Sequence, residues 1–282
     1  MLKKIAVGCA NFGNTYGLDS IKIKKNELIK IFDFCNENKI NFFDTADVYK
    51  NSYSELKKNK FNIKVDTKVF LDDDWKNYEH CKKHLLKIKE SLGFKYIDTL
   101  YIHNPKFLIN NSSKKLLSSL SRLKKEGLFK KTGISIYTYD SLYSDLKKFK
   151  FDVVQCPFNV FDQRLVNHGH LNKLKKMNIK VHVRSIFLQG ILLNENLKKK
   201  KKLRQFSKQL NHYFDYIKSK NINPLDFCLN YVINVKKIDK YIFGINSKKH
   251  LMEIKNFKVN KNYKYSMFDY SHKINLLDPG LW

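Results

Sequence analysis

Three polar residues lie at or near the ends of apolar stretches that are typical of β-strands: Asp44, Lys68 and His103. Side chains along a strand alternate between two faces, so Asp44 lies on the face opposite Phe43 and Thr45, and His103 lies on the face opposite Leu100 and Ile102. Tyr49 follows Asp44 in the loop just beyond its strand. We therefore expect Asp44, Lys68 and His103 to converge at one end of three neighbouring strands, with Tyr49 above them.

These residue types suit the reduction of a carbonyl group. A tyrosine with a pKa near 10 is a poor proton donor at neutral pH, but a nearby cation stabilises the phenolate and lowers that pKa. Lys68 can supply the positive charge, and Asp44 can hold the lysine in place. His103 can donate a hydrogen bond to the carbonyl oxygen as negative charge develops on it. Such a site would reduce a carbonyl if a hydride donor lay beside it.

Two other interpretations of the same residues stay open. Asp44, Lys68 and His103 could form a structural polar cluster that closes one end of a barrel, with Tyr49 an ordinary surface tyrosine. A metal site is disfavoured, because one histidine and one aspartate supply too few ligands and the lysine ammonium repels a cation.

The elements that must position these residues alternate regularly along the chain. Eight stretches are predicted strands: 4–8, 42–46, 63–70, 96–103, 131–137, 153–159, 180–187 and 240–246. Helices are predicted over 24–38, 53–60, 74–92, 114–125, 140–148, 166–177, 203–218, from 224 onward and over 248–257. Alternation with short connections favours a parallel sheet, and eight repeats favour a closed (β/α)8 barrel. At 282 residues, without a linker or composition break, residues 1–282 are predicted to form one domain.

The chain resembles a known family at several ordered positions. The motifs are D-T-A-x-x-Y at 44–49, T-K at 67–68 and Y-I-H-N-P at 101–105. They resemble those of the aldo-keto reductases, in particular the short bacterial-type members. The resemblance implies a TIM barrel that uses NADPH or NADH. It also implies a catalytic tetrad formed by Asp44, Tyr49, Lys68 and His103.

A dinucleotide would have to bind without a Rossmann glycine motif, since none is present. Barrel enzymes hold phosphates with the loops after the last strands and with a helix N-terminus. The segment 243–257 suits that role, and the resemblance implies that it holds the adenosine end. Its candidate residues are Gly244, Ser247, Lys249, His250 and Glu253. The family often has arginine where His250 stands, so the choice between the two dinucleotides is open, with NADPH slightly favoured. A solvated helix start is the structural alternative.

The resemblance also implies residues for the nicotinamide end, across the fifth to seventh strands. Ser135 and Gln155 match positions that bind the carboxamide, and Arg184 and Ser185 stand where many members place a stacking aromatic residue. Gln155 could instead be an ordinary polar residue at a strand end. For the substrate, a small carbonyl compound, the candidate wall residues are Phe12, Tyr16, Phe70, Asn104 and the C-terminal residues 276–282.

The net charge of +29 raises a different possibility, the binding of nucleic acid or an anionic membrane. Only four of the 55 basic residues are arginine, whereas surfaces that read phosphates favour the arginine fork. We therefore expect no specific nucleic-acid or membrane partner, although anionic ligands will be attracted. A cofactor-sensing subunit of the same fold without catalysis is a further alternative, and the oligomeric state is left open.

Five scattered cysteines without a C-x-x-C pair favour reduced thiols and a cytoplasmic protein. The N-terminal apolar run is too short for a signal peptide and is interpreted as a strand. No apolar run reaches about eighteen residues, so no transmembrane helix is expected.

Overall fold

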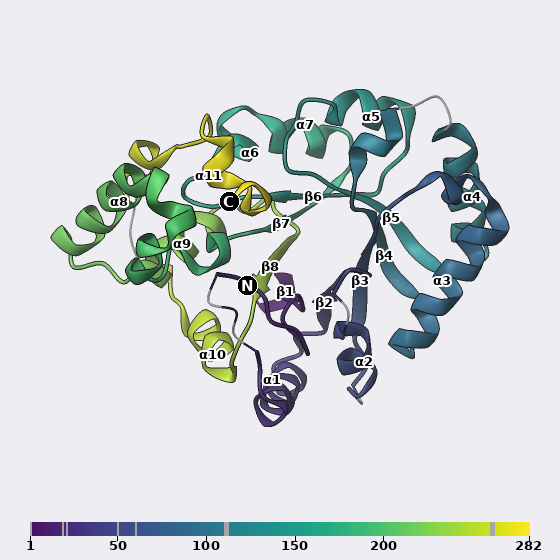
Figure 1. The fold of residues 1–282 in the computed structure, drawn as a ribbon, viewed down its shortest axis with the longest axis horizontal. Helices are drawn as coiled ribbons and strands as arrows, with labels where there is room; N and C mark the ends of the chain where they lie inside the picture. The colour runs from purple at the N-terminus through teal and green to yellow at the C-terminus, as the bar shows by residue number, and fades with distance from the viewer. Residues whose placement is uncertain are drawn as a thin grey trace.

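The computed structural model describes residues 2–18, 20, 22–49, 51–59, 61–109, 113–259 and 263–282. Eight parallel strands close into a barrel in sequence order. Figure 1 labels the strands inside the surrounding helices. The strands are β1 Ile5–Gly8, β2 Phe42–Asp44, β3 Lys64–Val69, β4 Ile97–Ile102, β5 Phe129–Ser135, β6 Val153–Pro157, β7 Lys180–Arg184 and β8 Lys240–Gly244. The predicted (β/α)8 barrel is confirmed, with every expected strand present.

Helices cover the outside of this barrel (Figure 1). They are α1 Lys25–Glu37, α2 Ser52–Lys57, α3 Tyr78–Leu92, α4 Ser113–Lys125, α5 Leu142–Lys148, α6 Arg164–Asn167, α7 His170–Lys176, α8 Ser207–Ser219, α9 Pro224–Ile233, α10 Lys248–Asn256 and α11 Ile274–Leu277. The helix predicted over 53–60 is shorter, and residue 60 lies outside the described residues. None of the described helices is both long and apolar enough to cross a bilayer.

Local sequence signals explain where several helices begin and end. Asn77 starts α3, because its side chain accepts hydrogen bonds from two backbone N–H groups of the first turn, at 2.8 and 3.2 Å. Gly93 ends the same helix with φ +71°, as its sequence position predicts. The segment 166–177 is not one helix as predicted, because Gly169 adopts φ +72° and separates α6 from α7.

Two apolar cores hold the molecule together. The larger lies between the outer face of the strands and the surrounding helices. The smaller packs α8 and α9 against the loop after β7 and the C-terminal segment, which Figure 1 draws in yellow beside α9. Trp282 donates hydrogen bonds to the carbonyls of Asn275 and Leu276 at 3.0 and 3.3 Å and packs on this core. All five cysteines are buried and free.

The inside of the barrel is polar one layer below the strand ends. The hydroxyl of Tyr101 lies 2.7 Å from Nδ1 of His182, and the same nitrogen lies 3.5 Å from Asp66 Oδ2. All three side chains are at most 4% exposed. The tyrosine ring fits because its cross-strand neighbour is Gly133, where a Cβ would lie 2.3 Å from Tyr101 Cδ1. This layer supports the residues at the mouth of the barrel.

Candidate active site

The predicted catalytic residues begin with a buried ion pair at the ends of β2 and β3. Lys68 Nζ lies 2.6 Å from Asp44 Oδ2 and donates a second hydrogen bond to the backbone oxygen of Thr45 at 2.9 Å. Lys68 is 1% and Asp44 5% exposed. A charge taken out of water needs a partner with good geometry, and each residue here supplies it for the other. The side chains predicted to converge on one strand end do so.

The second oxygen of Asp44 is held by a residue from the opposite side of the barrel. Gln155 Nε2 donates to Asp44 Oδ1 at 2.7 Å, and Gln155 Oε1 accepts a long hydrogen bond of 3.4 Å from Ser135 Oγ. Gln155 is 0% and Ser135 2% exposed, and neither lines the cavity described below. The two residues assigned to the carboxamide are therefore buried outside the cavity, where Gln155 contacts the ion pair and Ser135 contacts Gln155.

Tyr49 lines the cavity above the ion pair, with its ring centroid 5.8 Å from Lys68 Nζ. Burial raises the pKa of the Tyr49 phenol above its usual value, and the negative charge of Asp44 raises it further, whereas the Arg184 guanidinium lowers it. The expectation that Lys68 leaves this pKa lowered is wrong for the protein as described. The physical reason is that the positive charge of Lys68 is balanced by the negative charge of Asp44. Burial therefore has the largest effect on the pKa of Tyr49.

His103 lies beside Tyr49 in the cavity wall and is neutral at physiological pH. Burial, followed by the positive charges of Lys68 and Arg184, lowers the pKa of His103 to about 3. Its Nδ1 is buried and has no hydrogen-bond partner among the described residues. The ring of Phe70 packs on the imidazole with the two centroids 4.6 Å apart. The imidazole can thus present its other nitrogen to a ligand as an uncharged donor.

These residues form one end of a cavity of about 670 Å³ at the carboxyl ends of the strands. Its size is that of a small-molecule or cofactor site. The cavity runs from the ends of β2–β4 past the loops after β7 and β8 to α10. Of the predicted site residues, it is lined by Asp44, Tyr49, Lys68, His103, Arg184, Ser185, Gly244, His250 and Glu253.

The N-terminus of α10 is less open to phosphate than the sequence implies. The Ser247 hydroxyl caps it by accepting from the His250 N–H at 3.3 Å, and Glu27 Oε1 accepts from the Lys248 N–H at 2.7 Å. Lys249 is exposed and lies 3.9 Å from a carboxylate oxygen of Glu253. Neither Ser247 nor Lys249 lines the cavity. The helix therefore offers the side chains of His250 and Glu253 to a ligand directly. The backbone N–H groups of Lys248 and His250 are already engaged in hydrogen bonds.

Arg184 and Ser185 follow β7 and line the middle of the cavity. The Arg184 guanidinium carbon lies 4.0 Å from the centroid of the Tyr137 ring. It donates hydrogen bonds to the backbone oxygen of Ile136 at 3.0 Å and to Ser185 Oγ at 3.1 Å. Ser185 adopts φ +57°, an uncommon conformation for a non-glycine residue. The turn after β7 thus fixes a planar cation in the same cavity as the predicted catalytic residues.

The proposed substrate walls are only partly as expected. Tyr16 lines the cavity, and from the C-terminal segment Pro279 does so. Phe12 is fully buried outside the cavity, and Asn104 is held by two hydrogen bonds of 2.8 Å to the backbone of Leu71. Several lining residues were not predicted: Asn11, Tyr137, Asn223, Leu225 and Asn246. Tyr137 alone carried a signal, since it is an aromatic residue at the carboxyl end of the predicted strand 131–137.

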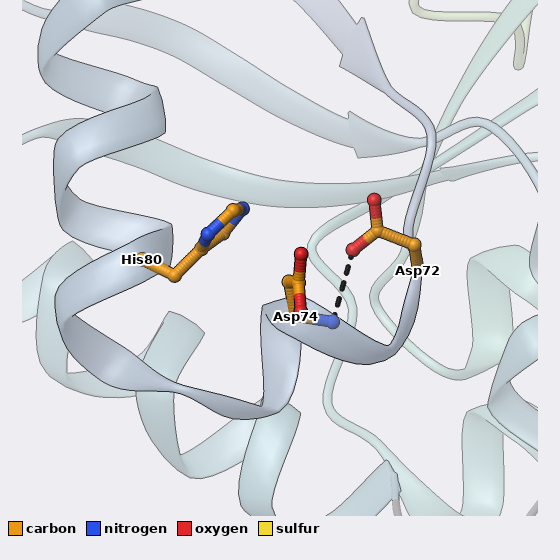
Figure 2. A group of neighbouring side chains, drawn as sticks. All are labelled: Asp72, Asp74 and His80. Atoms are coloured by element: carbon orange, nitrogen blue, oxygen red, sulfur yellow. Dashed lines mark hydrogen bonds between the residues drawn. The ribbon is translucent and has the colours of Figure 1, made fainter.

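A group of possible metal ligands lies outside the cavity, in the loop after β3 and the first turn of α3. Asp72, Asp74 and His80 have ligand atoms within 4.8 Å of one another. Figure 2 shows the three side chains near one another. All three are exposed. Asp72 accepts from the Asp74 N–H at 3.1 Å and thereby caps the 3-10 turn Asp73–Lys76. Their arrangement is explained by that cap, and we assign no metal to it.

Comparisons with known proteins agree with the barrel fold described above. A sequence profile described as the Aldo/keto reductase family matches residues 4–275. The uncharacterized oxidoreductase YqkF of Bacillus subtilis (strain 168) is 25% identical over 214 residues, which cover 70% of this chain. The match spans 64% of the length of YqkF, less than two thirds of that protein.

Solved structures share the fold at low sequence identity. The glycerol dehydrogenase AKR11B4 from Gluconobacter oxydans superposes with a TM-score of 0.67 at 16% identity, over 96% of this chain and 91% of that one. PA4992 from Pseudomonas aeruginosa, described as a candidate aldo-keto reductase, gives 0.63 at 16% identity with the same coverage of 96% and 91%. Because the family profile extends over nearly the whole length, this chain belongs to the aldo/keto reductase family.

Proposed function

We propose that this protein reduces a carbonyl group of a small molecule with NADPH or NADH. The observation that supports this most is the buried Asp44–Lys68 pair beneath Tyr49 and His103, at the end of a cavity large enough for a cofactor. A purely structural plug would not need a tyrosine and a neutral histidine facing the same open space.

Tyr49 is the proton donor in this proposal. Its raised pKa keeps the phenol protonated at neutral pH, so the donor is ready before the substrate binds. As the carbonyl carbon accepts a hydride, its oxygen gains the electron pair of the C=O bond and takes the proton from the Tyr49 hydroxyl. With that proton the alcohol product is complete. The phenolate left behind on Tyr49 is stabilised by the charge of Arg184, and it is reprotonated from water, which restores the proton donor for the next turnover.

His103 orients the carbonyl. With the proton on Nε2, the neutral imidazole donates a hydrogen bond to the carbonyl oxygen, and the buried Nδ1 is the unprotonated nitrogen. A neutral donor does not compete with Tyr49 as a proton source, because an imidazole with a pKa of about 3 gains no proton at neutral pH. Asp44 and Lys68 hold the floor of the site and fix the position of Tyr49 above it.

The rest of the cavity fits a dinucleotide. It continues from Tyr49 past Ser185 to Gly244, where an added Cβ would meet no atom within 4 Å, and on to His250. NADPH or NADH, when bound, supplies the hydride. In this proposal Ser185 and Gly244 lie along its middle, and His250, with Ser247 and Lys249 at the rim, lies near the adenosine end.

The test is a screen of the purified protein with NADPH and with NADH against aldehydes, ketones and keto-sugars. We expect saturable binding of at least one dinucleotide in EDTA, followed by its oxidation with a carbonyl. Tyr49→Phe should bind the dinucleotide normally and lose about 10²–10⁴ in rate, the usual contribution of general acid catalysis. Saturable binding without turnover of any carbonyl, or full activity of Tyr49→Phe, would contradict the proposal.

A further inference from the structure

Arg184 is a cation in the catalytic cavity without an anionic partner in the described part of the chain. The contrast with Arg164 is direct, because that buried guanidinium donates to both oxygens of Asp162 at 2.8 and 2.6 Å. Arg184 donates only to two neutral acceptors, Ile136 O and Ser185 Oγ. Arg184 is half-buried, and a partly desolvated charge gains stability from a partner of opposite sign. A guanidinium in a binding cavity with no such partner in the described part of the chain therefore indicates a ligand that carries the opposite charge.

The choice of arginine is itself informative in this chain. Only four of the 55 basic residues are arginine, so lysine is the default cation. A guanidinium presents five N–H donors in a planar fork that matches an oxyanion, which a lysine ammonium cannot do. Within the described residues, two of the five donors of Arg184 are engaged, which leaves three for a ligand. Stacking on the Tyr137 ring holds the plane of the fork in place.

Arg184 is also close enough to the reacting groups to act on the same molecule. Its charge lowers the pKa of Tyr49 and that of His103, so all three share one electrostatic environment. The rings of Tyr16 and Tyr49, with centroids 6.1 Å apart, line the same part of the cavity. A ligand whose carbonyl oxygen reaches Tyr49 can therefore reach Arg184 with a group a short chain away.

We infer that the substrate is a small carbonyl compound that carries an oxyanion, a carboxylate or a phosphate, and that Arg184 binds this group. The inference rests on the proposed function and names the substrate class of that site. The oxyanion takes no part in the reaction, and it fixes the carbonyl under Tyr49 by a charge-assisted, bidentate hydrogen bond. The dinucleotide also carries phosphates, so the experiment has to separate a substrate anion from a cofactor anion.

The experiment compares matched substrates that differ only in the anion. Aldehydes ending in a carboxylate, such as succinic semialdehyde, are paired with the corresponding terminal amide, and glyceraldehyde 3-phosphate is paired with glyceraldehyde. For each pair the readout is the ratio of kcat/KM for the charged and the neutral member. The ratio cancels any effect of a variant on Tyr49 or on the cofactor, because both members use the same site.

The wild type should prefer the charged member of the carboxylate or the phosphate pair by on the order of 30-fold or more, the size expected for a charge-assisted contact. Arg184→Gln should reduce that ratio to about 1, chiefly through KM, and Arg184→Lys should restore part of it. Arg204→Gln, which removes an exposed arginine from the 3-10 turn Lys201–Phe206, should leave the ratio unchanged.

Two results would overturn the inference and leave the proposed function standing. One is reduction of neutral and anionic carbonyls with equal efficiency. The other is a ratio that Arg184→Gln does not change while the dissociation constant of the dinucleotide rises, which would assign Arg184 to a cofactor phosphate. Absence of turnover for every carbonyl, neutral or charged, would instead overturn the proposed function.

Discussion

Gln155 donates a 2.7 Å hydrogen bond to the carboxylate of Asp44 across the inside of the barrel. The two residues are 111 positions apart, on β6 and at the end of β2. Lys68 takes the other oxygen of the same carboxylate, so Asp44 is bound on both sides. The resemblance to the family assigned this amide to the cofactor, but in the described structure it is hydrogen-bonded to Asp44 of the Asp44–Lys68 pair.

Gln155→Leu tests which role holds. If the amide positions Asp44, its loss leaves a buried carboxylate oxygen unpaired, at a cost of about 1–3 kcal/mol in the free energy of unfolding. We expect a lower melting temperature and a reduced kcat, with the dissociation constant of the dinucleotide nearly unchanged. Binding titrations and steady-state kinetics on the same variant separate the two roles. A large rise in that dissociation constant, with stability preserved, would return Gln155 to the carboxamide.

The Asp44–Lys68 pair predicts a strongly non-additive pair of substitutions. Lys68→Met leaves Asp44 charged and unpartnered in the interior, which should cost about 3–5 kcal/mol of stability, as breaking a buried pair does. Adding Asp44→Asn removes the stranded charge, so the double variant should regain most of the lost stability while remaining inactive. Denaturant unfolding of the two single variants and the double variant measures the coupling. Additive losses would mean that the pair is not coupled as the 2.6 Å contact implies.

Alternation along the strands was sufficient to predict the barrel and the shared location of Asp44, Lys68 and His103. This works because side chains of parallel strands repeat every two residues, and neighbouring strands carry their ends to the same side. Sequence order alone does not say which side chains meet across the interior. Gln155 reaches Asp44, and Glu27 reaches the N–H of Lys248, which lies 221 positions away in the sequence. These contacts depend on the lengths and angles of the strands and helices, which only the closed barrel sets.

The electrostatics of the site were also beyond the sequence. The prediction that Lys68 lowers the pKa of Tyr49 counted a charge and ignored burial, which has the larger effect here. The absence of an anionic partner for Arg184 among the residues that the structure describes could not be predicted either, because it depends on which carboxylates the fold keeps away from the guanidinium. Glycine at 169 was a readable signal for a helix break, and the helical pattern on both sides obscured it.

The lowered pKa of His103 predicts a specific acid sensitivity. Its ordinary pKa of 6.5 falls to about 3 in the folded protein, so the folded state holds fewer protons than the unfolded state between these values. The stability of the wild type is therefore unaffected by this group above pH 6.5 and declines as the pH falls from about 6.5 toward about 3. Removing the imidazole with His103→Gln removes that decline.

Thermal melts of the wild type and of His103→Gln from pH 7.5 to pH 4 measure this effect. We expect the melting temperature of the wild type to fall more steeply with acid than that of the variant. Parallel curves would show that the imidazole is not held neutral. The activity of the wild type should not fall with a midpoint near pH 6.5, because His103 does not titrate there in the folded protein. His103→Gln should therefore not abolish any loss of activity near that pH.

Gly133 is predicted to be intolerant of even a methyl group. A Cβ at this position would lie 2.3 Å from Cδ1 and 2.5 Å from Cε1 of Tyr101, whose ring is fixed by the hydrogen bond to His182 in the barrel interior. The ring cannot move away without breaking that bond, because the interior is packed on all sides. Gly133→Ala should therefore cost about 1–3 kcal/mol, the range for overpacking a core. Gly244→Ala is the matched control, since a Cβ there meets no atom within 4 Å, and its melting temperature should stay close to that of the wild type.

The clash can be assigned to Tyr101 by a double-mutant cycle. Tyr101→Leu alone loses the hydrogen bond to His182 and should destabilise the protein by itself. In that background the methyl group of Gly133→Ala meets no ring, so adding it should cost much less than it does in the wild type. Because Tyr101 is the cross-strand neighbour of Gly133 on one side and of Lys68 on the other, the coupling reports on the packing next to the Asp44–Lys68 pair. An equal cost of Gly133→Ala in both backgrounds would show that the backbone, and not the tyrosine ring, requires glycine at this position.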